Sequence, residues 1–232
     1  RHSIMLYKKT QKKVKQGDEM ETEGRIQIDP GFVFTQKKHL TVSKTSNFFS
    51  NDGFAVYDDS KGELVLRVES YGPDVQKDAT TLMDANGNVL ITVKRKRPSL
   101  HCRWEGFLGE KKEEQKAVFG VRRSSMIGRS EMIVEVYGNE SEEYRIEGSF
   151  AMRHCSVYDA ATRTVVAEIR RKVDASSGVL LGKDVFSLTV VPGFDGAFAM
   201  ALVMVVDQIT GDNGDYPFGS SPVHPAESDA QV

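Results

Sequence analysis

Residues 197–206 read Ala-Phe-Ala-Met-Ala-Leu-Val-Met-Val-Val, an apolar run with no polar interruption. As a helix it would span about 15 Å, half of a hydrocarbon core of about 30 Å. Pro192 and Asp195 before the run and Asp207 after it prevent an extension, so we expect no transmembrane span. A buried strand is the alternative and is supported by the valines, but alanine, leucine and methionine favour a helix. Asp195 and Gly211 also suit its two ends.

A helix that is apolar on every side must be surrounded by protein on every side. In a chain composed mainly of strands, the place that surrounds a helix is the inside of a barrel. We therefore predict a central helix whose core residues include Ala197, Phe198, Met200, Leu202, Val203 and Val206.

The sequence before this run is dominated by β-hairpins. In three of them, at 54–68, 81–93 and 156–169, a short apolar strand ends in an aspartate, and a polar turn and a β-branched strand follow. An aspartate side chain suits that position because it accepts hydrogen bonds from turn amides. A fourth hairpin covers 132–150, and further strands are expected near Leu40, Trp104, Val118 and Val185. The prediction is a mainly β fold, a closed antiparallel barrel of about twelve strands around the C-terminal helix.

Composition divides the chain of 232 residues into three parts. Residues 1–31, which include the lysine-rich run 8–15, are a polar leader that we expect to be flexible. Residues 32–210 form the barrel domain, and residues 211–232, rich in Gly, Pro, Ser and Asp, form a disordered tail. The 31 basic and 33 acidic residues give a net charge of −2, which argues against nucleic acid as the partner.

Several stretches together resemble the plant LURP-one-related family, which is similar to the tubby C-terminal domain and to phospholipid scramblases. The stretches are Leu40-Thr-Val42, Asn51-Asp-Gly-Phe54, Leu64-Val-Leu-Arg-Val68, Leu82-Met-Asp84, Lys94-Arg-Lys96, Ser99-Leu-His101, Arg103-Trp-Glu105, Gly148-Ser-Phe150, Val157-Tyr-Asp159, Ala199-Met-Ala-Leu202 and Asp207-Gln-Ile209. The resemblance implies a tubby-like barrel, a link to plant defence, and tethering to membranes. Tubby proteins bind phosphoinositide head groups through surface basic residues, which do not match this chain position by position.

The candidate site consists of two basic groups at predicted strand ends. If Val89, Ile91 and Val93 face the core, Lys94 and Lys96 face solvent. If Val165, Ala167 and Ile169 face the core, Arg170 and Lys172 face solvent. We predict that Lys94, Lys96, Arg170 and Lys172 form one surface for a phosphorylated lipid head group. The alternative is that these charges are solvated strand ends.

No other pattern predicts an enzyme, a metal site or a cofactor. The pairs His101-Cys102 and His154-Cys155 cannot each chelate one ion easily, because adjacent strand residues point to opposite faces. The two cysteines also make no disulfide framework, and no secretory signal is visible in the given sequence. We expect a cytoplasmic protein, with a peripheral membrane or a nuclear location also open.

Two functions follow from these observations. The first is a non-enzymatic module that tethers to membranes or binds phosphoinositides, with a role in plant defence. The second is a scaffold or regulator that binds another protein and no lipid.

Overall fold

The computed structural model describes residues 25–46, 52–69, 79–97, 102–125, 131–139 and 142–211. Residues 1–24 of the predicted leader, residues 212–232 of the predicted tail, and His101 lie outside the described residues.

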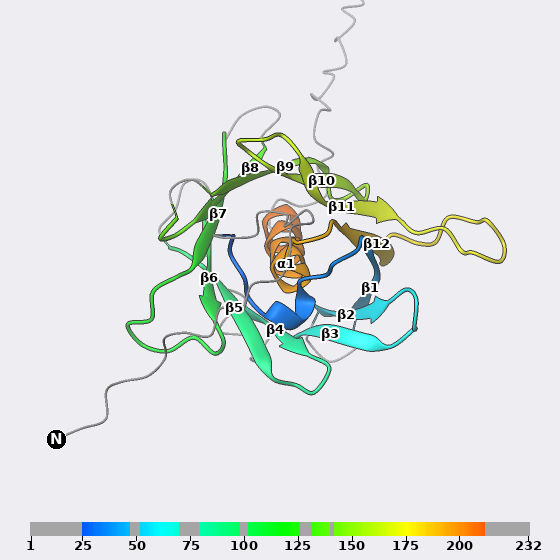
Figure 1. Cartoon of the computed structure of the whole chain (residues 1–232), viewed down its shortest axis with the longest axis horizontal. Coiled ribbons are helices and arrows are strands. Elements are labelled where there is room, and N and C mark those ends of the chain that lie inside the picture. Colours follow the sequence, from blue (N-terminus) through cyan, green and yellow to red (C-terminus); the bar gives the residue numbers. More distant parts are fainter. Residues whose placement is uncertain are drawn as a thin grey trace, which may run out of the picture.

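Twelve antiparallel strands close into a barrel, in the order β1-β12-β11-β10-β9-β8-β7-β6-β5-β4-β3-β2. Figure 1 shows this ring of strands around one central helix. The closed mainly β architecture predicted from the hairpin pattern is thereby confirmed. The strands are β1 (Lys38–Ser46), β2 (Asp52–Asp58), β3 (Leu64–Glu69), β4 (Ala79–Asp84), β5 (Val89–Arg95), β6 (Trp104–Leu108), β7 (Phe119–Arg123), β8 (Met132–Val136), β9 (Glu143–Ser149), β10 (His154–Asp159), β11 (Val165–Arg171) and β12 (Val185–Val190).

The hairpins β2–β3, β4–β5 and β10–β11 are built alike. Each first strand ends in an aspartate, Asp58, Asp84 or Asp159, whose carboxylate accepts hydrogen bonds from backbone amides in the turn that follows. Each pair also shifts register shortly before the turn. The shift corrects one part of the predicted alternation, because Val165 is 40% exposed and its neighbour Val166 is buried instead. A bulge adds one residue to a strand and so reverses the facing of residues beyond it.

The helix α1 (Gly196–Gly211) fills the barrel, as the apolar run predicts. Its six predicted core residues, Ala197, Phe198, Met200, Leu202, Val203 and Val206, are each at most 2% exposed. The ring of Phe198 lies edge-on to Phe119 of β7 and Tyr144 of β9, with centroid distances of 5.1 Å and 5.8 Å. The core is therefore the contact between the inner barrel wall and every side of α1.

Asp195 begins the helix and connects it to the N-terminal segment. One carboxylate oxygen accepts the amide of Phe198 at 2.9 Å, which is an N-cap. The other accepts the amides of Ile28 and Asp29 at 2.6 Å and 3.0 Å. Residues 25–31, predicted as part of the leader, therefore lie against the barrel end where α1 begins, and the short 3-10 helix η1 (Pro30–Phe32) starts within this stretch. Amides of this stretch donate to side chains that are far away in the sequence, so a local sequence pattern could not predict these contacts.

Candidate functional site

The two predicted basic groups lie at the same end of the barrel but on opposite walls. Lys94 is in β5 and Lys96 follows that strand, while Arg170 is in β11 and Lys172 follows that strand. Each strand of the barrel runs antiparallel to its neighbours, so all odd-numbered strands run in the same direction. The C-terminal ends of β5 and β11 therefore lie at the same end of the barrel. Starting from β11, however, β5 is the sixth strand reached in either direction. The four side chains are thus not brought together into one pocket, and their binding to a lipid head group remains a prediction.

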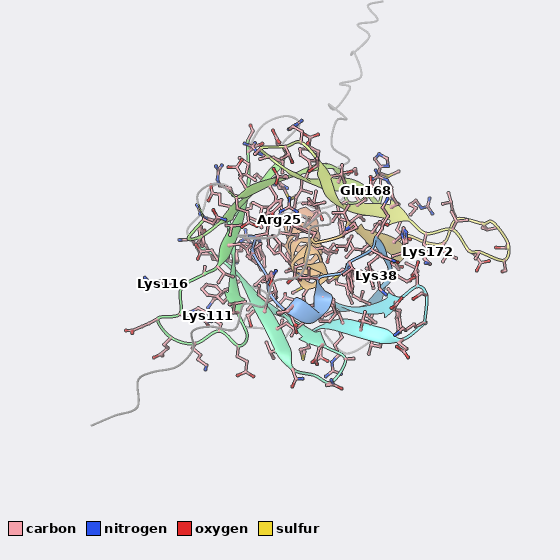
Figure 2. All side chains as sticks on the ribbon, viewed as in Figure 1. Arg25, Lys38, Lys111, Lys116, Glu168 and Lys172 are labelled. Carbon is pink, nitrogen blue, oxygen red and sulfur yellow. The ribbon has the colours of Figure 1, made fainter. Side chains whose placement is uncertain are left out.

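Three of these four residues pair with acidic side chains. Lys96 contacts Glu105 at 2.8 Å, Arg170 contacts Glu168 at 2.9 Å, and Lys172 reaches Asp59 at 2.8 Å. Figure 2 shows Glu168 and Lys172 on one side of the barrel, away from Lys111 and Lys116. Lys94 is exposed and has no ion-pair partner within the described ranges. These surface ion pairs stabilise the fold little. An external anion can therefore compete with the acidic partners for the three cations.

We call the end of the barrel where α1 ends the basic end. It is defined by residues at or just beyond the ends of strands that reach it: Lys94, Lys96, Arg122, Arg123, Arg153, Arg170, Lys172 and Lys183. Arg123 holds the helix in place by donating to the carbonyl of Ile209 at 3.4 Å. Lys44, near the end of β1 and outside this set, also pairs with Asp207 of the helix at 3.5 Å. Positive charge near a helix C-terminus is favourable because the carbonyls there are partly negative.

Arg153 has a different environment from the surface cations of the basic end. It is 7% exposed, its guanidinium lies 4.1 Å and 4.4 Å from the ring centroids of Phe150 and Phe186, and its Nε donates to the carbonyl of Lys183. Burial lowers the pKa of Arg153 from its ordinary value. This side chain therefore joins the β9–β10 turn to the start of β12 rather than facing a ligand.

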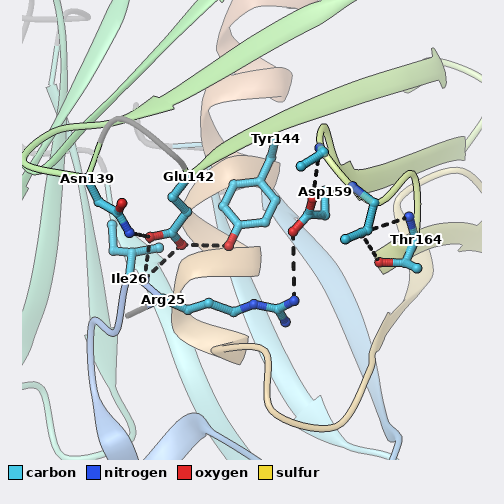
Figure 3. Close-up of polar contacts among 9 residues, drawn as sticks. Arg25, Ile26, Asn139, Glu142, Tyr144, Asp159 and Thr164 are labelled. Carbon is cyan, nitrogen blue, oxygen red and sulfur yellow. Dashed lines mark hydrogen bonds and ion pairs between the residues drawn. The ribbon is translucent and has the colours of Figure 1, made fainter. Parts of the chain in front are cut away.

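The opposite end of the barrel contains a buried polar network (Figure 3). The carboxylate of Glu142 accepts the Ile26 amide at 2.8 Å, the Tyr144 hydroxyl at 2.6 Å and the Asn139 side-chain amide at 3.2 Å. Arg25 lies 3.7 Å from Asp159. Burial and the neighbouring carboxylate raise the pKa of Tyr144 well above its usual range. The network closes this end and satisfies the groups that it buries.

A depression of about 360 Å³ lies on the outer wall over β9, β10 and β11. Sequence reasoning did not single it out. Its lining consists of Glu147, Gly148, His154, Ser156, Tyr158, Arg163 and Val165. One signal was available: the turn Ala160-Ala-Thr-Arg163 has an arginine where the turn after β2 has Gly62.

The residues considered for metal binding or catalysis do not form such a site among those described. Burial raises the pKa of the Cys155 thiol to about 12, which makes it a poor nucleophile at neutral pH. Asp58, Asp84 and Asp159 lie in separate turns, as the hairpin chemistry predicts. No group of three His, Cys, Asp or Glu side chains suited to a metal occurs in the part of the chain that the structure describes.

The fold and its charged end define a class of protein, a closed antiparallel barrel built around a hydrophobic C-terminal helix. A family model described as LURP-one-related matches residues 38–207, which span β1 to most of α1. The chain belongs to the LURP-one-related family.

Relatives of similar length occur in Arabidopsis thaliana. Protein LURP-one-related 5 is 58% identical over 210 residues, covering 89% of this chain and 99% of the relative. Protein LURP-one-related 12 is 56% identical over 206 residues, covering 88% and 92%. An X-ray structure of an Arabidopsis thaliana protein superimposes with a TM-score of 0.61 at 23% identity, over 81% of this chain and 99% of that one, and shows the fold alone. Among the described helices, α1 included, none has the length and apolarity to cross a membrane.

Proposed function

We propose that this protein is a non-enzymatic module that tethers to an anionic, phosphoinositide-containing membrane through its basic end. The observation that supports this proposal is the placement of Lys94 and Lys96 across the barrel from Arg170 and Lys172, with all four near one end. A single head group cannot bridge opposite walls of a twelve-strand barrel. A membrane plane can meet both walls at once, and each basic residue near it contributes about 1 kcal/mol.

Exposed apolar side chains on the β11–β12 connection add to the argument. Val173, Val179 and Leu180 are 48%, 61% and 52% exposed, and Val173 and Leu180 pair in an isolated bridge. This connection follows β11 and so leaves the barrel wall beside Lys172 (Figure 1). Apolar side chains flanked by cations are typical of a surface that meets the lipid head-group region.

The resemblance to tubby-like proteins and to defence-linked relatives supports a role for this module in plant defence signalling. Burial raises the pKa of the Cys155 thiol, so this thiol is a poor candidate for a nucleophile. The second function, a scaffold that binds another protein and no lipid, would use the same exposed β11–β12 connection. Vesicle binding separates the two.

The test is cosedimentation with vesicles containing phosphatidylinositol phosphates. We expect Lys94→Ala/Lys96→Ala and Arg170→Ala/Lys172→Ala each to weaken binding roughly tenfold or more, with binding of the unaltered protein falling steeply with salt. The matched control is Lys112→Ala/Lys116→Ala, which removes two charges from the β6–β7 connection at the other end of the barrel.

Control and double variants that bind equally well would contradict the assignment of the basic end. Failure of the unaltered protein to bind any anionic vesicle would contradict membrane tethering and favour the protein-binding scaffold.

A further inference from the structure

Arg163 occupies a backbone position that related turns in this chain give to glycine. In the turns that begin at Asp58, Asp159 and Asp174, the amide four residues on donates to the aspartate carbonyl. The residue at that position has a φ of +70° in Gly62, +67° in Gly178 and +60° in Arg163. Glycine adopts this left-handed conformation without a steric penalty, whereas a Cβ disfavours it. The turn after β10 therefore retains an arginine at a position where glycine would fit better.

The Arg163 side chain covers a tyrosine that lines the depression over β9–β11. Its guanidinium lies 4.7 Å from the ring centroid of Tyr158. Tyr158 is 7% exposed, and its hydroxyl is buried without a hydrogen-bond partner among the described residues. A buried hydroxyl left unpaired is costly and uncommon in folded proteins. The ionic contact of Arg163 is a distant one, 4.0 Å to Glu147, and Arg163 is 66% exposed. The guanidinium is therefore loosely held and free to take another anion.

Two further polar groups line the same depression. His154 is exposed, and the Ser156 hydroxyl accepts a hydrogen bond of 3.4 Å from Arg170. Arg163, Tyr158 and His154, which carry a guanidinium, a phenol and an imidazole, thus line one hollow of about 360 Å³. We propose that this hollow binds a phosphate monoester carried by a small polar molecule, with Arg163 and Tyr158 as its main donors.

The donor set favours a phosphate over a carboxylate. A phosphate monoester presents three terminal oxygens, and guanidinium groups pair with such oxyanions through two parallel hydrogen bonds. Arg163, Tyr158 and His154 supply donors of three kinds for these oxygens. When the phosphate takes the guanidinium from Glu147, the Tyr158 hydroxyl gains an acceptor. The site lies on the barrel wall and is independent of membrane tethering by the basic end.

The experiment is an amide-resolved NMR titration of the full chain with inorganic phosphate and with glucose 6-phosphate, at constant ionic strength. We expect saturable shifts in β9–β11, including Tyr158 and Arg163. Arg163→Gly and Tyr158→Phe should each weaken binding roughly tenfold. Neither variant should lower the melting temperature, because glycine fits the turn and phenylalanine removes an unpaired hydroxyl.

The control is Lys61→Ala, which removes a positive charge from the equivalent turn after β2 and should leave the shifts unchanged. A parallel titration with vesicles containing phosphatidylinositol phosphate shows which kind of molecule carries the phosphate. If Tyr158 and Arg163 shift with these vesicles and not with the soluble phosphates, the ligand is a lipid head group and the proposal of a small soluble ligand is wrong. Two results would overturn the site: no shifts in β9–β11 with either phosphate, or unchanged binding in the variants together with a lower melting temperature, which would make Arg163 and Tyr158 structural.

Discussion

Asp58 ends β2, and its carboxylate accepts hydrogen bonds from Lys38 and from the amide and hydroxyl of Ser60. These hydrogen bonds hold the pKa of Asp58 well below its usual range, and the bond from Lys38 has the largest effect. The aspartate at the strand end could be predicted from the sequence, since the turn chemistry is local. Its ion pair with Lys38 could not, because β1 and β2 must first be aligned in register to bring the two side chains together.

A lowered pKa makes the contribution of Asp58 to stability depend on pH in a definite direction. The folded state favours the charged carboxylate, so the contribution is present above the pKa of an unfolded aspartate, about 3.9, and is lost as the pH falls below it. We expect Asp58→Ala to reduce the free energy of unfolding by about 1–2 kcal/mol at neutral pH, from the lost cap and ion pair. The difference from the unaltered protein should shrink between about pH 4 and pH 2.

Urea unfolding followed across that pH range measures this difference. Lys38→Ala should show the same trend, since Lys38 is the main cause of the shift. A difference between Asp58→Ala and the unaltered protein that stays constant down to pH 2 would show that the charge of Asp58 does not contribute.

The helix α1 is the element whose type and burial the sequence predicts best. Ten apolar residues in succession leave no polar face, and a helix of this kind is stable in water only when fully enclosed. The strands are predicted almost as well, because their turns are marked by Asp, Asn and Gly. Bulges are not predicted: Val165 becomes exposed since register shifts between Val157 and Tyr158, and that depends on how β10 pairs with β11.

Phe198→Ala tests the packing between helix and barrel. The Phe198 ring contacts Phe119, Tyr144 and Phe194 and is fully buried. We expect a loss of about 3–5 kcal/mol in the free energy of unfolding, because the cavity cannot collapse between a closed wall and a central helix. Val165→Ala, on the partly exposed outer wall, should cost less than about 1 kcal/mol. Equal losses in the two variants by urea denaturation would contradict the central position of α1.

Asp195 connects parts of the molecule that are distant in sequence. Its carboxylate caps α1 through Phe198 and accepts the amides of Ile28 and Asp29, which closes the barrel end with the N-terminal segment. Burial raises the pKa of Asp195, and the amide hydrogen bonds partly oppose this effect. The cap could be expected from the sequence, whereas the two amides come from residues more than 160 positions away.

Asp195→Ala is expected to lower the free energy of unfolding by about 2–4 kcal/mol, because it removes the cap and leaves buried amides unpaired. It should also raise the hydrogen exchange of the Ile28 and Asp29 amides. Asp29→Ala removes the equivalent cap of η1, where the bond to Gly31 is exposed, and should cost about 1 kcal/mol or less. Unchanged exchange at Ile28 in Asp195→Ala would show that Asp195 does not hold the segment.

Some features of the candidate site follow from local sequence, and others depend on contacts between distant segments. Period-two alternation places Lys94 and Lys96 outward, because that pattern is a property of one strand. Whether β5 lies beside β11 or across from it depends on the order in which twelve strands close, and no single segment encodes that order. The depression over β9–β11 was missed for the same reason, since its lining comes from three strands and a turn.

The amino-acid sequence by itself thus determined the elements, the helix to be buried, and the turn residues of the hairpins, because each depends on neighbours within a few positions. The tertiary structure decided the rest: two basic groups on opposite walls at one end, an arginine laid over an unpaired tyrosine, and an N-terminal segment held by Asp195 and Glu142. The physical reason is closure, which brings together strands that the chain keeps far apart.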